Sequence, residues 1–300
     1  MSNFFEKKTL EQIKKYETGV SQIDNFLSLA ECGEILDYLR NLKNQSVGKS
    51  QMVQREESTK IFFNFEQSKL LNKIKAKIEN LVGEFFVNDF QPHIITSRYP
   101  LRLHADTGKN PNDIIFKNII IPLEINYNKD SKTHKPPNTI IFKNKWYNQS
   151  ALFTHNIGKD YDFIIKDRNS NFVDILDIKD FYKKILKLNN DEINYKNCAF
   201  FVDEKFKKYI ESLTKSKRYN IRTNKHIINS NNFNKNDYEN YMSHQPYEDC
   251  QSLEIDKVIE WKIGSLIFWD RTRIHSSDNF LVNNVLNKTT MAMFTSKTKF

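Results

Sequence analysis

The chain has 300 residues, of which 39% are hydrophobic and 28% charged. That balance is typical of a globular protein with a sizeable core, and seven glycines and seven prolines are too few for a fibrous chain. The net charge of +9 permits a nucleic acid or an anionic surface as partner. Because acidic residues are interleaved with the lysines, a solvated surface is the favoured interpretation, and nucleic-acid binding is the weaker one.

Three cysteines without a CxxC spacing argue against both a disulfide scaffold and a zinc knuckle. No apolar run approaches the ~20 residues that span a bilayer. The N-terminal residues lack the apolar core of a signal peptide. We therefore expect a cytoplasmic protein with reduced thiols and no membrane partner.

Residues 1–18 predict a short polar helix or arm, and residues 20–26 a short strand. Ser28 and Glu31 have the spacing of a capping box, and apolar residues then repeat at helical spacing up to residue 42. A second helix is predicted over residues 68–86, where the apolar side chains form one stripe.

After residue 90 the pattern becomes extended and rich in isoleucine, which predicts strands at 93–104, 118–126, 139–146, 258–261, 265–269 and 288–295. Gly264 lies between two of these strands, at a strand pair or a turn. Residues 150–250 are interpreted as an insertion or lid subdomain, with helical patterns at 180–188 and 204–213. Helices followed by strands predict a single α+β domain over residues 1–300, built on a β-sandwich or jelly roll.

The sequence HADTG places His104 and Asp106 two residues apart, so on a strand both side chains point to the same face. An imidazole nitrogen and a carboxylate oxygen can then bind one metal ion, with His275 arriving from a separate strand. Two histidines and one carboxylate leave three positions of an octahedron open, as non-haem iron(II) oxygenases require. The pair by itself also fits a surface turn after a strand, and both interpretations stay open at this point.

Four stretches in chain order resemble the iron(II)/2-oxoglutarate-dependent dioxygenase superfamily, in its phytanoyl and prolyl hydroxylase-like branches. They are VSQIDNFLSLAECGEILDYL, SRYPLRLHADTG, EWKIGSLIFWDRTRIHSSDNF and KTTMAMFT. The resemblance covers residues 20–43, 93–126 and 255–296. It implies a double-stranded β-helix, a jelly-roll or cupin-like core with N-terminal helices and a large inserted segment.

The resemblance also implies His104, Asp106 and His275 as ligands of Fe(II), with 2-oxoglutarate and O2 as cosubstrates. A basic residue after the distal histidine should bind the far carboxylate of 2-oxoglutarate, and Lys288 is the best match. Thr290 follows on the same strand face. The remaining candidates are Tyr99 for the cosubstrate, Arg271 and Arg273 as rivals of Lys288 or as substrate contacts, and Arg98 for substrate or support.

The expected reaction is hydroxylation of a substrate with release of succinate and CO2. A small molecule is the first choice of substrate, a protein side chain the second and a nucleic-acid base the third. Two other classes stay open: a non-catalytic jelly-roll binding module, and a nucleic-acid-binding protein with an incidental HxD pair. His155 and His244, in or beside the inserted segment, are weaker candidates for substrate contact. The oligomeric state and the exact substrate are not encoded in any motif.

Overall fold

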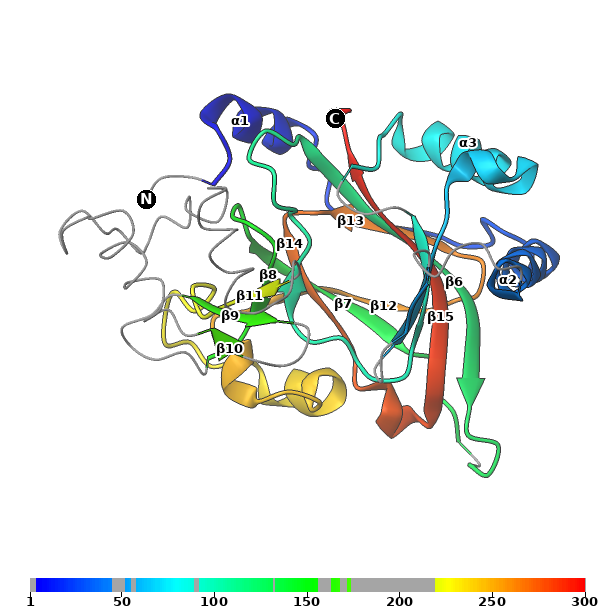
Figure 1. Ribbon diagram of the computed structural model, residues 1–300. Helices are drawn as coiled ribbons and strands as arrows, with labels where there is room; N and C mark the ends of the chain where they lie inside the picture. The colour runs from blue at the N-terminus through cyan, green and yellow to red at the C-terminus, as the bar shows by residue number, and fades with distance from the viewer. Residues whose placement is uncertain are drawn as a thin grey trace.

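The computed structural model describes residues 4–44, 52–54, 58–88, 92–131, 133–155, 163–167, 172–173 and 219–299. Two β-sheets pack against each other, and helices cover the outer side of one of them (Figure 1). We call the seven-stranded sheet, with the order β1-β13-β6-β15-β4-β3-β2, the helix-covered sheet. The eight-stranded sheet, with the order β10-β9-β11-β8-β5-β14-β7-β12, is the site sheet.

In spatial order, the strands of the helix-covered sheet are β1 (Val20–Ile23), β13 (Leu266–Asp270), β6 (Ile115–Tyr127), β15 (Val285–Ser296), β4 (His93–Ser97), β3 (Ser58–Phe62) and β2 (Met52–Gln54). Those of the site sheet are β10 (Phe172–Val173), β9 (Phe163–Asp167), β11 (Tyr219–Thr223), β8 (Ala151–Phe153), β5 (His104–Ala105), β14 (Arg273–Ser277), β7 (Asn138–Lys145) and β12 (Ile255–Glu260). The described helices and helical turns are α1 (Lys7–Lys15), α2 (Leu29–Asn44), η2 (Phe65–Gln67), α3 (Lys69–Val82), α6 (Lys235–Asp237), η6 (Tyr238–Met242), η7 (Tyr247–Cys250) and η8 (Phe280–Asn283).

The chain passes back and forth between the two sheets. Strands β4, β6, β13 and β15 belong to the helix-covered sheet, whereas β5, β7, β12 and β14 belong to the site sheet. Of the two alternatives predicted around Gly264, the turn is right and the strand pair is wrong, because β12 pairs with β7 while β13 pairs with β6 and β1. The turn carries the chain from one sheet to the other.

Glycine is the residue type that fits at position 264, where the chain crosses from the site sheet to the helix-covered sheet. Its φ of +77° lies in the left-handed region, and an added Cβ would sit 2.2 Å from the carbonyl oxygen of Leu27. The backbone N–H of Leu27 donates to the Gly264 carbonyl at 2.8 Å. This hydrogen bond holds the segment that leads into α2 against the turn between β12 and β13.

Both predicted helices form, with one difference in length. At the start of α2, the Ser28 N–H donates to the Glu31 carboxylate at 2.8 Å and the Glu31 N–H to the Ser28 hydroxyl at 3.1 Å, which confirms the capping box. The second helix, α3, ends at Val82 rather than at residue 86, because Gly83 has a φ of +86°. Phe85 is still buried, but from the segment after the helix.

Side chains alternate between the two faces of each strand, so the helix-covered sheet contributes to two separate cores. The outward residues of the helix-covered sheet pack with α2 and α3, in a cluster that includes Ile35, Leu71, Ile74, Ile78, Ile119, Ile121, Met291 and Met293. The inward residues meet the site sheet in a second cluster of Val20, Ile141, Ile259, Trp261, Ile267 and Trp269. Polar residues such as Asn118 and Thr290 lie among these inward positions, between the sheets.

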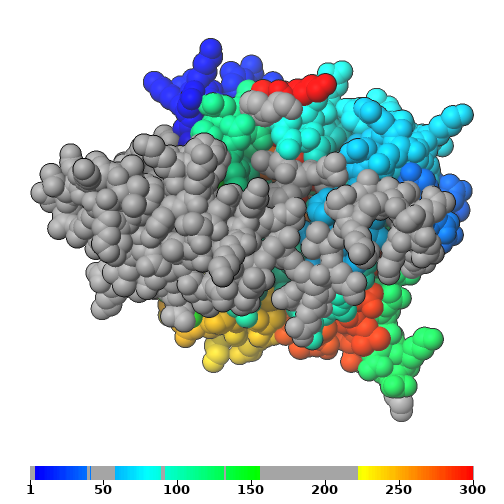
Figure 2. Space-filling view, in the orientation of Figure 1, coloured from blue at the N-terminus to red at the C-terminus, as the bar shows by residue number. Residues whose placement is uncertain are grey.

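Residues from the predicted insertion enlarge the site sheet. Strand β8 pairs with β5, and β11 runs parallel to β8 on its other side. The helical patterns at 180–188 and 204–213 lie outside the described residues, so the insertion and the single domain stay predictions. Along the face seen in Figure 2, α1 and α3 lie at one edge and the segment around α6 and η6 at the other. Within the described part of the chain, no helix has the length and apolar character needed to cross a membrane.

Candidate metal centre

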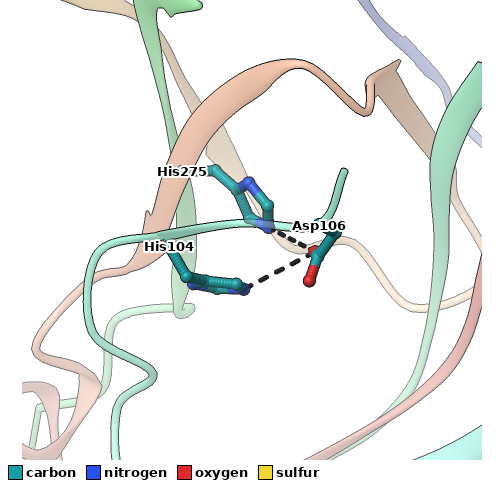
Figure 3. Close-up of side chains that lie close together, drawn as sticks. All are labelled: His104, Asp106 and His275. Atoms are coloured by element: carbon teal, nitrogen blue, oxygen red, sulfur yellow. Dashed lines mark ion pairs between the residues drawn. The ribbon is translucent and has the colours of Figure 1, made fainter. Parts of the chain in front are cut away.

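Strand pairing places two of the predicted ligands side by side. His275 on β14 is the direct antiparallel partner of His104 on β5, so the two side chains point to the same face of the site sheet. Asp106 is the first residue after β5, and its carboxylate points towards both rings (Figure 3). Residues far apart in the sequence are thus brought together by one strand pair.

The three side chains form a compact donor group. Asp106 Oδ2 lies 3.0 Å from His275 Nε2 and 3.6 Å from His104 Nε2. One ligand atom from each residue can be chosen so that all lie within 4.8 Å of one another. Two imidazole nitrogens and a carboxylate oxygen form the donor set that suits a divalent transition metal with open positions.

Backbone carbonyls set the orientation of both imidazoles. His104 Nδ1 lies 2.7 Å from the carbonyl oxygen of Arg102, and His275 Nδ1 lies 3.0 Å from that of Arg273. Because a carbonyl oxygen accepts only, Nδ1 carries the proton in both rings. The Nε2 atoms, which lie nearest Asp106, are then the nitrogens that would bind a cation.

Asp106 is held by residues that the sequence did not single out for this purpose. Asn118 Nδ2 donates to Asp106 Oδ2 at 3.1 Å. Arg271, predicted as a cosubstrate or substrate residue, is only 1% exposed and donates through Nε to the Asp106 backbone carbonyl at 2.8 Å. In the sequence, the feature that could have pointed to Asn118 as a site residue is its polar side chain at the start of the apolar stretch NIIIPLEIN.

The surroundings favour the protonation states that bind metal. Burial and the neighbouring His275 lower the pKa of His104 to about 4, so its ring is neutral near pH 7. Burial alone would raise the pKa of the Asp106 carboxyl, but His104, His275 and Arg271 outweigh it and hold that pKa well below its usual range. A neutral imidazole and an ionised carboxylate are the forms that ligate a divalent cation.

Lys288 lies buried between the sheets, with 4% of its surface exposed. Its Nζ donates to the Ser277 hydroxyl at 2.7 Å and lies 4.0 Å from the centre of the Trp261 ring. Burial lowers its pKa to about 8, against the opposing effect of Asp278. Among the described residues, no carboxylate lies within ion-pair distance of this ammonium group.

Lys288 is also linked to the donor group through β14. Ser277, its hydrogen-bond partner, is two residues from His275 and therefore on the same strand face. Two residues of extended strand correspond to about 7 Å. The Lys288 ammonium group therefore contacts the same strand and the same face that carry the metal ligand His275.

The contacts of the other predicted residues give less support for a role in binding 2-oxoglutarate or substrate. Thr290 is buried, but its hydroxyl donates to the Ile121 carbonyl at 2.8 Å. Arg273 donates to the Phe142 carbonyl and to Asp256 at 2.7 Å, so its guanidinium is already paired. Tyr99 lies in the loop after β4 with 48% of its surface exposed, and Arg98 reaches Thr59 at 3.3 Å. Their functional roles stay predictions.

Two buried polar atoms near the donor group lack partners within the described residues. Trp269 and Asn118 are direct partners on β13 and β6, and both face the site sheet. The indole Nε1 of Trp269 and the amide Oδ1 of Asn118 are buried without a hydrogen bond. Since buried polar groups in proteins are almost always hydrogen-bonded, these atoms fit a space that receives a polar ligand. The Trp269 ring centre lies 4.9 Å from that of His275.

Comparison with known proteins gave results only at the level of structure. No protein-family model matches the chain. No curated protein matches it either. Among solved structures, the epimerase SnoN in complex with Fe3+, α-ketoglutarate and nogalamycin RO is 9% identical, with a TM-score of 0.40, over 96% of this chain and 83% of its own.

Two further solved structures resemble this chain over nearly its whole length. The EctD apoform from S. alaskensis is 9% identical, with a TM-score of 0.39, over 98% of this chain and 78% of its own. A Pseudomonas putida prolyl-4-hydroxylase is 7% identical, with a TM-score of 0.36, over 97% of this chain and all of its own. Another neighbour is a 2OG-Fe(II) oxygenase family oxidoreductase from Burkholderia pseudomallei, so the neighbours include the family that the motifs resemble. The likenesses are weak, and the site's own geometry is what supports a function.

Proposed function

We propose that this protein is an iron(II)- and 2-oxoglutarate-dependent oxygenase that hydroxylates a small molecule and releases succinate and CO2. The observation that carries the proposal is a group of two histidines and one aspartate on the face of β14 that also contacts a buried lysine, which has no carboxylate within ion-pair distance among the described residues. His104, Asp106 and His275 hold the iron in this proposal, and Lys288 binds the far carboxylate of 2-oxoglutarate.

Strand order supports a double-stranded β-helix as the core. Four neighbouring strands of the helix-covered sheet are β13, β6, β15 and β4, and four of the site sheet are β12, β7, β14 and β5. Along the chain these eight strands alternate between the sheets except at β7 and β12, which both belong to the site sheet, and such alternation is how two facing sheets wind into a jelly-roll core. The metal ligands then lie inside the core, on the middle strands of the site sheet, where β5 meets β14.

The donor set fits iron(II) because it supplies two imidazoles and one carboxylate and leaves the rest of an octahedron to small ligands. Structural zinc sites instead close a tetrahedron with four protein ligands. The hydrogen bonds from His104 and His275 to backbone carbonyls orient both rings before any ion binds. Asn118 and Arg271 fix the Asp106 side chain and backbone, respectively.

The surroundings of Lys288 fit the far end of 2-oxoglutarate. A carboxylate there would receive a charge-assisted hydrogen bond from Nζ, with the Ser277 hydroxyl beside it. The aromatic rings of Trp261 and Phe280 pack on the ammonium group and exclude water, which strengthens the interaction. The Trp269 indole N–H is a further donor close to His275.

With iron and 2-oxoglutarate bound, the centre would supply the oxidising chemistry of O2, with 2-oxoglutarate leaving as succinate and CO2. The residues of the chain bind, orient and shield these groups. A protein side chain is the alternative substrate, and a non-catalytic binding module is the alternative class. Formation of succinate separates the enzyme from the binding module.

The test is anaerobic titration of the protein with iron(II) and 2-oxoglutarate. We expect a visible charge-transfer band at one equivalent of each, followed by succinate formation when O2 is admitted. Asp106→Ala should abolish both the band and succinate formation, because it removes the only carboxylate of the donor group. Asp130→Ala, at an exposed loop position, is the matched control and should behave as the unaltered protein.

Calorimetric binding of cobalt(II) provides a readout independent of turnover. The unaltered protein should bind one equivalent, and Asp106→Ala should bind it at least tenfold more weakly. Tight cobalt binding by Asp106→Ala, or absence of the charge-transfer band from the unaltered protein, would overturn the proposal.

A further inference from the structure

One row of side chains crosses the site sheet from the metal ligands towards the added strands. His275 on β14 pairs with His104 on β5, His104 pairs with Leu152 on β8, and Leu152 pairs with Arg222 on β11. Directly paired residues in neighbouring strands point to the same face of a sheet. Arg222 therefore projects to the face that carries the metal ligands.

Burial along β8 and β11 agrees with this direction. Ala151, Phe153 and Thr223, at the alternate positions, are buried on the opposite face. Leu152 and Arg222 are partly exposed. Two strand spacings separate Arg222 from His104, which places its Cα about 10 Å from that of His104. An extended arginine side chain covers much of such a distance, so the guanidinium lies within reach of a small molecule bound beside the metal.

The guanidinium of Arg222 has no partner among the described residues. Its Nε is buried without a hydrogen bond, and no carboxylate lies within ion-pair distance. Asp249 is near enough to act on it electrostatically, but the Asp249 Oδ1 accepts from the His155 N–H at 2.8 Å and the Thr154 hydroxyl at 3.2 Å. His155 Nδ1 is a further neighbour of the same oxygen, at 2.5 Å.

A second arginine lies near Arg222. Burial lowers the pKa of Arg222, and so does Arg102, which is exposed and precedes His104 by two residues, while Asp249 opposes both. A partly buried arginine beside a second one is unfavourable unless an anion joins them. The planar fork of a guanidinium matches carboxylate and phosphate oxygens, with two parallel hydrogen bonds.

We propose that Arg222 binds an oxyanion of the substrate, a carboxylate or phosphate group, so that the proposed oxygenase acts on an anionic small molecule. This inference rests on the proposed function and names its substrate class. Arg102 supports the same anion from the loop before β5. Arg222 is then a specificity-determining residue, because a neutral analogue would leave its donors unpaired.

The anion bound here differs from 2-oxoglutarate. Lys288 contacts Ser277, which is two residues along β14 from His275. Arg222 lies across the strands instead, two strands beyond His104 and three from His275. Two cationic positions therefore lie in different directions from the metal ligands, one for the cosubstrate and one for the substrate.

A binding experiment tests the anion site without turnover. Acetate and inorganic phosphate are titrated at constant ionic strength into the full chain loaded anaerobically with iron(II) and saturating 2-oxoglutarate, and separately into the full chain without these additions. We expect one of the two anions to bind, and Arg222→Gln to weaken that binding at least tenfold in both forms. Lys235→Gln, which removes an exposed positive charge on α6, should leave binding unchanged. The preferred anion identifies a carboxylate or a phosphate ester as the substrate group.

A turnover experiment tests the substrate class. Carboxylated and phosphorylated metabolites are compared with their methyl esters, amides or dephosphorylated forms for stimulation of succinate formation. We expect stimulation by anionic members only, with KM raised at least tenfold in Arg222→Gln and partly restored in Arg222→Lys. Equal stimulation by neutral analogues would overturn the inference, and so would Arg222→Gln weakening 2-oxoglutarate binding instead.

The two proposals can fail separately. Anion binding that depends on Arg222 in the chain without iron, together with absence of the charge-transfer band, would support the anion site and overturn the oxygenase. The band with anion binding that is insensitive to Arg222→Gln would support the oxygenase and overturn the anion site.

Discussion

Two buried lysines on neighbouring strands of the helix-covered sheet have opposite surroundings. Lys117 on β6 forms a buried ion pair with Asp270 and donates to the Thr18 hydroxyl at 2.8 Å and to the Tyr16 carbonyl at 3.2 Å. Lys288 on β15 has one hydroxyl and two aromatic rings around it. Both ammonium groups are almost completely removed from solvent.

The difference shows how a structural charge is told from one that awaits a ligand. The Asp270 carboxylate that pairs with Lys117 also accepts from the Thr18 and Gly19 N–H groups at 3.0 and 2.8 Å, so this network joins the N-terminal segment to the sheet. Every member is satisfied, as buried structural networks require. Lys288 lacks such a carboxylate among the described residues, and 2-oxoglutarate would provide it.

The largest expected effect is a loss of stability on breaking the ion pair of Lys117 and Asp270. Lys117→Met removes the nearest cation from the buried Asp270 carboxylate and leaves only the longer contact of 3.9 Å with Arg273 Nε among the described residues, which should lower the free energy of unfolding by about 3–5 kcal/mol. Urea denaturation measures this change. Asp270→Asn in the same chain should recover part of the loss, since it removes the stranded charge. If Lys117→Met alone unfolds at the concentration of urea that unfolds the unaltered protein, the network is not structural.

The matched change at the second lysine should affect binding rather than folding. Lys288→Met removes a buried charge that has no carboxylate within ion-pair distance among the described residues, so stability should be unchanged or higher. Affinity for 2-oxoglutarate should fall about 100-fold, which corresponds to about 2.7 kcal/mol. The anaerobic titration described above gives the Kd, and urea denaturation gives the stability. A large loss of stability with intact 2-oxoglutarate binding would reverse the roles of the two lysines.

The smallest expected effect is the pH dependence that Lys288 confers. Its pKa is about 8 in the folded protein and 10.5 in the reference state, so between these values the unfolded chain binds more protons. Stability of the ligand-free protein should therefore rise with pH, by about 2 kcal/mol between pH 7 and 9.5 from this group.

Denaturation at both pH values, in the unaltered protein and in Lys288→Met, isolates this contribution. The difference between the two proteins should shrink as the pH rises. Saturating 2-oxoglutarate should remove the effect, because a bound carboxylate holds the lysine in its charged form. A difference that grows with pH would contradict the assignment of the low pKa to Lys288.

The sequence predicted those parts of the site that depend on local periodicity. The two-residue spacing of His104 and Asp106 and the capping box at Ser28 are local rules, and the structure follows both. The juxtaposition of His275 with His104 depended on a resemblance, because strand pairing over such a sequence separation leaves no local mark.

Other features could not be predicted because they depend on pairing between distant segments. Asn118 reaches Asp106 only because β6 and the end of β5 face each other across the core. Arg222 joins the row of the metal ligands through a parallel pairing of β11 with β8, on strands that the sequence assigned to an insertion. The Gly264 crossing was predicted as two alternatives, since a glycine between apolar runs permits a hairpin or a change of sheet.

The carbonyl-bound imidazoles have a consequence for how the protein acquires its cation. Because the β5–β14 pair and the Arg102 and Arg273 carbonyls already aim both rings, the empty protein and the loaded protein should differ little in shape. Two imidazoles and a carboxylate that fit iron(II) also bind nickel, cobalt or zinc, and the intrinsic affinity among these ions follows their chemical series. Occupancy should then track which ion the surroundings supply, and preparations grown in different media should carry different metals.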